Sequence, residues 1–188
     1  MALLRRDRIV EDPWTLVGDE SPLPATPAVV TYARWARDTE ALLRRNGELG
    51  IRLASDQPPE LIAGDLRRFG LVCLEFPKFT DGRAYSYARI LRARYDYPGE
   101  LRAVGNVLRD QLLFMRRCGF DAFEIPDDAD AEAWKLAFDD FTVRYQPSVD
   151  RLPTAFHLRS GAATLSRRWQ RLPRRRDSGP AERMAAEG

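Results

Sequence analysis

A short apolar run followed by a turn and then by a segment of helical periodicity recurs five times between residues 28 and 141. The apolar runs are AVVTY, GIRLA, LVCLEF, ELRAVG and DAFEI. In the segments that follow them, apolar side chains recur three or four residues apart, which indicates amphipathic helices. Neighbouring parallel strands need a long crossover connection, and each unit supplies one. The repeat therefore predicts an α/β fold with a mostly parallel sheet of about five βα units.

The pattern leaves two arrangements of these units open, an open doubly wound sheet or a partial barrel. Five strands are too few to close the usual eight-stranded parallel barrel. The segments ELRAVG and CGFDAFEI nevertheless resemble the late strands of such a barrel. Of the two arrangements, we favour the open sheet.

The chain divides into three segments by composition. Residues 1–27 contain four prolines, which favours an N-terminal arm, extended or forming a short edge strand near residues 9–17, over a helix. Residues 28–146 hold the five units and form the α/β domain, and 188 residues suffice for one hydrophobic core. Residues 147–188 are rich in Pro and Arg and lose helical spacing, which predicts a flexible, disordered C-terminal tail.

The charge distribution argues against a nucleic-acid partner. The net charge of +2 combines a tail of about +6, with nine Arg in residues 151–188, and a body of about −4. A DNA-binding protein ordinarily has a basic folded body or a recognition motif. The sequence also has no apolar run of about 18 residues, so we expect no membrane span and a cytoplasmic location. Its oligomeric state is left open.

The sequence lacks the residues that most classes of catalytic and cofactor-binding site require. Cys73 lies inside an apolar run, Cys118 ends a predicted helix, and the one histidine, His157, falls in the predicted tail. A metal site and a Ser-His-Asp triad are therefore not expected. The glycine-rich dinucleotide and phosphate motifs are absent, so no cofactor is evident. A flavin remains compatible, because flavin binding has no obligatory short motif.

The segments after the third and fourth strands carry the best candidates for a binding site. In parallel sheets, ligands bind beyond the carboxyl ends of the strands. Lys78 and Arg83 follow the third strand and Arg109 follows the fourth, so they could converge with helix N-termini on a small anion such as sulfite, sulfate or phosphate. Asp81 and Asp110 are candidate catalytic acid and base residues. The competing interpretation is structural: these residues cap helices, stabilise turns and pair with nearby charges.

Residues 74–125, from LEFPKFTDGR to CGFDAFEI, resemble the central signature of domain-of-unknown-function family 934. The segment GIRLASDQPPE, residues 50–60, is similar to the family's upstream segment, and the resemblance covers roughly residues 28–146. The blocks FPKFTDGR, GELRAVG and VLRDQL are specific in combination. The chain departs from the family pattern at Asn106, where an acid often stands, and in its Arg-rich tail.

The resemblance implies a bacterial protein associated with sulfite reduction and sulfur assimilation, described as a probable oxidoreductase on the basis of gene neighbourhood. We expect an accessory protein of assimilatory sulfite reduction, whose partner is sulfite reductase or another sulfur-assimilation protein. The alternative is an enzyme in its own right, either a flavin-dependent oxidoreductase or a small-anion-handling enzyme. The resemblance leaves open which of the two applies.

Overall fold

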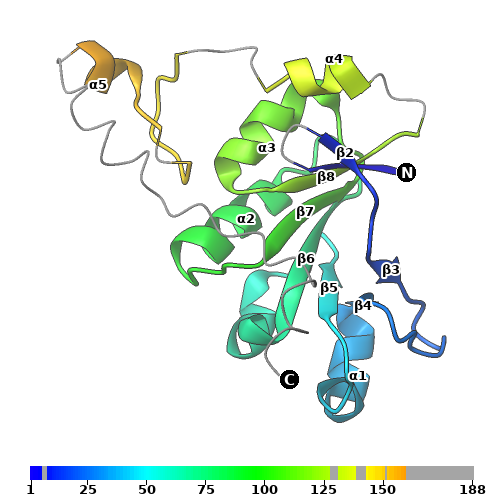
Figure 1. Cartoon of the computed structure of the whole chain (residues 1–188). Helices are drawn as coiled ribbons and strands as arrows, with labels where there is room; N and C mark the ends of the chain where they lie inside the picture. Colours follow the sequence, from blue (N-terminus) through cyan, green and yellow to red (C-terminus); the bar gives the residue numbers. More distant parts are fainter. Residues whose placement is uncertain (6–7, 128–130, 139–142, 151, 160–188) are drawn as a thin grey trace, which may run out of the picture. The chain divides into compact units, whose positions relative to one another are not determined.

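The computed structural model describes residues 1–5, 8–127, 131–138, 143–150 and 152–159 (Figure 1). These residues fall into two compact units. The first comprises residues 1–142 and 148–150, and it contains the sheet. The second comprises residues 143–147 and the chain from 151 onward.

The first unit is built on one mixed sheet with the strand order β2-β1-β8-β7-β6-β5-β4-β3. Strands β3 to β8 are parallel to one another. Two further strands extend the sheet beyond β8: β1 pairs antiparallel with β8, and β2 pairs antiparallel with β1. The strands are β1 (Ala2–Arg5), β2 (Arg8–Val10), β3 (Thr15–Leu16), β4 (Ala28–Thr31), β5 (Leu49–Leu53), β6 (Phe69–Phe76), β7 (Glu100–Gly105) and β8 (Ala122–Ile125).

Helical segments connect the parallel strands from β4 to β8, as the repeated pattern predicted. None in the described part of the chain has the length and apolar character needed to cross a membrane. The helices are α1 (Tyr32–Leu43), the 3-10 helix η1 (Pro59–Arg68), α2 (Arg83–Ala93), the short 3-10 helix η2 (Arg109–Gln111), α3 (Leu112–Cys118) and α4 (Ala131–Leu136) in the first unit, and α5 (Ala155–Arg159) in the second.

The predicted α/β class and the five βα units are confirmed, and the strands of these units lie in sequence order from β4 to β8. The sheet is open, as we favoured, and it curls like part of a barrel. It is not doubly wound, because its parallel strands follow one another in sequence order without a reversal. Two further features differ from the prediction. The second connection is a 3-10 helix, and the sheet gains the antiparallel strands β1 and β2.

In the first unit, the helices α1, η1, α2 and α3 pack against one face of the sheet, and no described helix of this unit covers the other face (Figure 1). The main core joins apolar side chains of α1, η1, α2 and α3 to alternate strand residues such as Val72, Leu74 and Leu101. The opposite face, which we call the open face, holds a smaller apolar cluster of Val29, Leu71, Cys73 and Val104. Because strand side chains alternate between faces, this division follows from the register of the strands.

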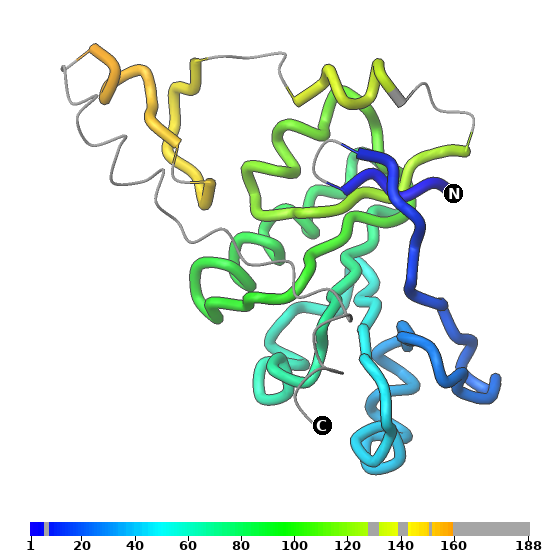
Figure 2. Tube along the Cα trace, viewed as in Figure 1, coloured from blue at the N-terminus to red at the C-terminus, as the bar shows by residue number. Residues whose placement is uncertain are grey.

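A short N-terminal segment crosses the open face. Strand β2 lies at one edge of the sheet and β3 at the other, yet only residues 11–14, here called the strap, separate them. Figure 2 follows this segment in blue. Eight strands spaced by about 4.8 Å would span about 34 Å if the sheet were flat. The five steps from Val10 to Thr15 reach at most about 18 Å. The sheet must therefore curl toward the strap.

The second unit is small in its described part. Arg144 forms a parallel bridge with Thr154, and the Oγ1 of Thr154 lies 2.7 Å from Nδ1 of His157 in α5. Most of the predicted tail, residues 160–188, lies outside the described residues.

Candidate functional site

The carboxyl ends of β6 and β7 meet at one edge of the sheet, where the predicted anion-binding segments begin. Phe76, the last residue of β6, pairs with Gly105, the last residue of β7. The backbone N–H of Asn106 donates to the carbonyl oxygen of Phe76 at 2.7 Å. The loops that follow therefore leave the sheet side by side, which is the arrangement that the anion-site hypothesis needs.

Asp81 and Arg83 form a two-pronged ion pair in the loop after β6. The Nη2 and Nε of Arg83 donate to the two carboxylate oxygens of Asp81 at 2.6 and 3.0 Å, and Nη2 also donates to Oγ of Ser55 at 2.9 Å. The hydrogen bonds from Arg83 hold the pKa of Asp81 well below its usual range. Asp81 is therefore ionised at neutral pH, and its carboxylate matches the charge of Arg83.

The other predicted site residues lie on the surface of the same edge. Lys78, Arg109 and Asp110 are all exposed. The Nε of Arg109 donates to the carbonyl oxygen of Ala133 at 2.7 Å. The anion-binding role of Lys78, Arg83 and Arg109 remains a prediction, as does a catalytic role for Asp81 or Asp110.

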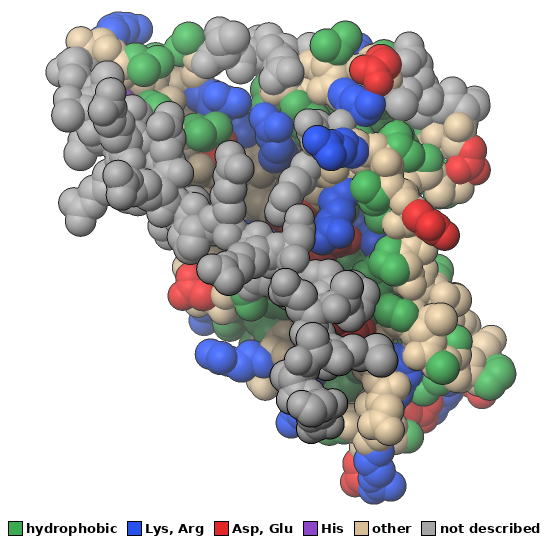
Figure 3. Space-filling view, viewed as in Figure 1, with side chains coloured by type: hydrophobic (Ala, Val, Ile, Leu, Met, Phe, Trp, Pro, Cys, Tyr) green, Lys and Arg blue, Asp and Glu red, His purple; other side chains and the backbone are tan. Residues whose placement is uncertain are grey.

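A second group of functional side chains, which the sequence analysis did not single out, lies on the open face. Arg52, Cys73 and Arg102 occupy neighbouring positions on β5, β6 and β7, in one row across the sheet. Blue basic and red acidic side chains lie next to each other over β7 and β8 in Figure 3. This face therefore combines charged groups with the apolar cluster around Cys73.

Arg102 is the centre of the charged group and is only 1% exposed. Its Nη1 and Nη2 donate to the two carboxylate oxygens of Asp12 in the strap at 2.6 and 3.0 Å. Nη2 and Nε also donate to Oε1 of Glu100, at 3.0 and 3.2 Å. Burial disfavours the charged guanidinium, but the hydrogen bonds that Arg102 donates to Asp12 and the nearby Glu100 carboxylate more than offset this effect, so the pKa of Arg102 is raised. Arg102 thus fastens the strap to β7.

Glu124, Arg52 and Glu75 are charged groups of this face that form no hydrogen bond with Arg102. The carboxylate of Glu124 lies 4.0 Å from Nη1 of Arg102, which is too far for a hydrogen bond. Desolvation raises the pKa of Glu124, although the positive charges of Arg102 and Arg52 oppose the shift. Arg52 pairs with Glu75 at 3.2 Å, and both side chains are partly exposed. Each group can therefore accept a further polar partner.

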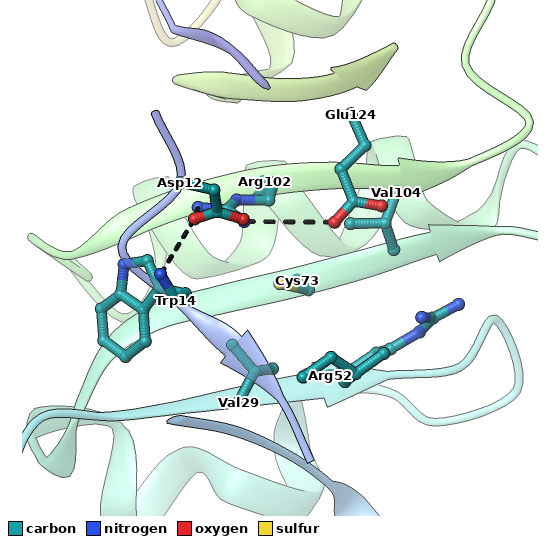
Figure 4. Close-up of a pocket in the computed structure, with 9 residues that line it drawn as sticks. Asp12, Trp14, Val29, Arg52, Cys73, Arg102, Val104 and Glu124 are labelled. Atoms are coloured by element: carbon teal, nitrogen blue, oxygen red, sulfur yellow. Dashed lines mark hydrogen bonds and ion pairs between the residues drawn. The ribbon is translucent and has the colours of Figure 1, made fainter. Parts of the chain in front are cut away.

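Between these groups the strap and the curled sheet enclose a groove of about 100 Å³ (Figure 4). Its charged walls are Asp12, Arg52, Arg102 and Glu124. Its apolar lining consists of Trp14, Leu16, Val29, Cys73 and Val104. Gly70 lets the Trp14 ring lie close to the sheet, because a Cβ at that position would stand 3.3 Å from the indole. The result is a small groove that pairs opposite charges with an apolar floor.

The Cys73 thiol in this groove is expected to be chemically inert in the folded protein. Burial raises its pKa to about 12, so almost no thiolate exists at pH 8. In a Cys118→Ser variant, we expect iodoacetamide to label Cys73 at least about a hundredfold more slowly than a free thiol of pKa about 8.5. After denaturation, labelling should become rapid. Rapid labelling of the native variant, followed by mass spectrometry, would show instead that the groove activates the thiol.

The sequence did carry a signal for this group. Arg52, Arg102 and Glu124 each interrupt an otherwise apolar strand at a position whose side chain points to the same face. A charged residue at the centre of a buried strand is seldom tolerated without a partner. Asp12, in contrast, comes from a segment whose place over the sheet cannot be inferred from local pattern.

Comparison with known proteins gives one match. The sequence profile of a family described as "Bacterial protein of unknown function (DUF934)" matches residues 50–156. No curated protein and no solved structure matches the chain. The matched segment contains β5 to β8 and both loops at the carboxyl edge, whereas the strap lies before it.

Proposed function

Because the chain belongs to the DUF934 family of bacterial proteins, we propose that it is a cytoplasmic accessory protein of assimilatory sulfite reduction. In this role it docks to sulfite reductase or to a neighbouring enzyme of sulfur assimilation. The link to sulfite reduction is supported by the resemblance of the blocks FPKFTDGR, GELRAVG and VLRDQL. The docking mode is supported by the surface at the carboxyl edge of the sheet.

The observation that carries the docking proposal is a pair of exposed apolar side chains in the two adjacent loops. Phe79 follows β6 and is 56% exposed, and Leu108 follows β7 and is 37% exposed. Both have basic neighbours in the sequence, Lys78 and Arg109, which are also exposed. Apolar anchors with a charged rim are typical of protein interfaces, and Arg and aromatic residues are frequent among their hot spots. The partner surface should therefore be apolar at its centre and acidic at its rim.

Replacing Phe79 or Leu108 by alanine is expected to weaken binding to the sulfite reductase at least tenfold, because each change removes an apolar anchor. Biolayer interferometry with the purified reductase measures the effect. Leu43→Ala serves as the matched control, because Leu43 is similarly exposed but ends α1, away from these loops. Failure of the unaltered chain to bind the reductase at micromolar concentration would overturn this docking mode.

A genetic experiment tests the pathway independently of the docking surface. Deleting the gene should slow growth when sulfate is the sole sulfur source, and cysteine should restore growth. The Phe79→Ala and Leu108→Ala chains should complement the deletion poorly, and Leu43→Ala should complement it fully. Normal growth of the deletion strain on sulfate would argue against a role in sulfite reduction.

The adjacency of the two loops also favours a second candidate, a small-anion-handling enzyme that binds the anion at Lys78, Arg83 and Arg109 and uses Asp81 or Asp110 as acid and base. Such an enzyme should bind sulfite or phosphate, and replacing Lys78 and Arg109 by glutamine should abolish binding. The other alternative, a flavin-dependent oxidoreductase, requires flavin absorbance in the spectrum of the protein purified from its own host. A colourless protein that elutes with the reductase favours the accessory role.

A further inference from the structure

The groove beneath the strap is chemically distinct from the loops at the carboxyl edge. We propose that it binds a small α-amino acid in its zwitterionic form, with the carboxylate at Arg52 and the ammonium group at Glu124. This inference does not rest on the sulfite-reduction role, because no residue of the groove belongs to the docking loops.

The charges of the groove select against simple ions. Two of its four charged groups, Arg102 and Asp12, neutralise each other through two hydrogen bonds. Of the remaining two, which stand on different sides of the groove (Figure 4), Glu124 has no ion-pair partner at hydrogen-bonding distance among the described residues, and Arg52 pairs with Glu75, which does not line the groove. An anion would meet Glu124 and Asp12, and a cation would meet Arg52 and Arg102. A dipolar solute can place an ammonium group at the unpaired Glu124 and a carboxylate at the remaining N–H donors of Arg52.

The unused hydrogen-bonding capacity of Arg52 and Glu124 also favours a zwitterionic ligand. Arg52 has five N–H donors, and the described residues provide one carboxylate contact, from Glu75 at 3.2 Å. Glu124 forms no hydrogen bond with a described residue, and its nearest cationic nitrogen is 4.0 Å away. The partial burial that raises its pKa would be offset by an ammonium group at hydrogen-bonding distance. A ligand carboxylate would accept hydrogen bonds from the remaining N–H groups of Arg52, and a ligand ammonium group would donate hydrogen bonds to Glu124.

The size and floor of the groove limit the side chain of the ligand. A cavity needs about 10–15 Å³ to hold one water, so the groove of about 100 Å³ accommodates a solute of about seven non-hydrogen atoms. Alanine, serine and cysteine have this size. The floor is made of Cys73, Val29 and Val104, and Trp14 forms the cover. These groups suit a short, weakly polar side chain.

Isothermal titration calorimetry of the full chain tests the inference with L-alanine, L-serine and L-cysteine as probes. At least one of them should bind with a dissociation constant of a millimolar or lower. Propionate, which lacks the ammonium group, and ethylamine, which lacks the carboxylate, should bind at least tenfold more weakly. These comparisons use the unaltered protein and do not depend on the folding of any variant.

Two substitutions then locate the site. Arg52→Gln and Glu124→Gln should each weaken amino-acid binding at least tenfold, and circular dichroism should show that both variants remain folded. The matched controls are Arg44→Gln and Glu40→Gln, which break an exposed ion pair on α1 and should leave binding unchanged. The proposal is overturned if none of the three amino acids binds at 10 mM, if propionate binds as tightly as alanine, or if Glu124→Gln has no effect.

Discussion

Replacing Arg102 by methionine is expected to lower the free energy of unfolding by about 3–5 kcal/mol, the usual cost of removing one partner of a buried ion pair. The substitution keeps most of the side-chain volume but leaves Asp12 and the nearly buried Glu100 without their shared cation. It should also release the strap, because the Asp12–Arg102 pair is the contact that fastens it to β7. Urea denaturation measures the loss of stability.

Arg44→Met is the matched control, since Arg44 forms only an exposed pair with Glu40, and the expected change is below about 0.5 kcal/mol. Hydrogen exchange gives a second readout, because the amides of residues 8–16 should lose protection in the Arg102 variant first. A change in stability below about 1 kcal/mol would mean that the strap is held chiefly by Trp14, and that the ion pair contributes little.

Replacing Phe76 by alanine is expected to cost about 3–5 kcal/mol for a different reason, the cavity left in the main core. Phe76 is 0% exposed, and its ring lies 5.0 Å from that of Tyr85 on α2 and 5.8 Å from that of Phe120, which precedes β8. The substitution therefore removes contacts that join the middle of the sheet to its helical layer. Thermal and urea denaturation should both report the loss.

The chain provides a matched control three residues away. Phe79→Ala removes the same side chain from a position that is 56% exposed, so the stability should change by less than about 0.5 kcal/mol. The pair of variants thus separates burial from residue type. A similar loss in both would imply that the loop after β6 is packed against something in solution, as in a self-associated form of the protein.

The parts of the fold that depend on local pattern were predictable from the sequence. Strands β4 to β8 and the helix α2 lie where apolar runs and helical spacing placed them, and the adjacency of β6 and β7 follows from the crossover rule. Strand β1 was not predicted, because ALLR is only four residues long and its partner, β8, lies about 120 residues later in the sequence. Local pattern contains no information about such a pairing.

The two candidate sites also differ in how far the sequence could predict them. The candidate residues at the carboxyl edge could be predicted, because the loops that follow parallel strands lie at that edge of the sheet. The ion pair between Arg83 and Asp81 in one of these loops was not predicted. The groove depends on the strap, and no periodicity shows that Asp12 would reach Arg102 across 90 residues of sequence. The charged strand residues Arg52 and Arg102 indicated that something unusual lay on that face, but their partners could be found only in three dimensions.

The pairing of β1 with β8 also limits the order in which the strands of the sheet can pair during translation. The central strands β4 to β7 and their helices can associate as they emerge, since their contacts are short in sequence. The first five residues, in contrast, have to wait for Ala122–Ile125 to leave the exit tunnel before they find their place. Until then the edge of β7 stays unpaired, and an unpaired edge is most exposed to aggregation while the chain is incomplete.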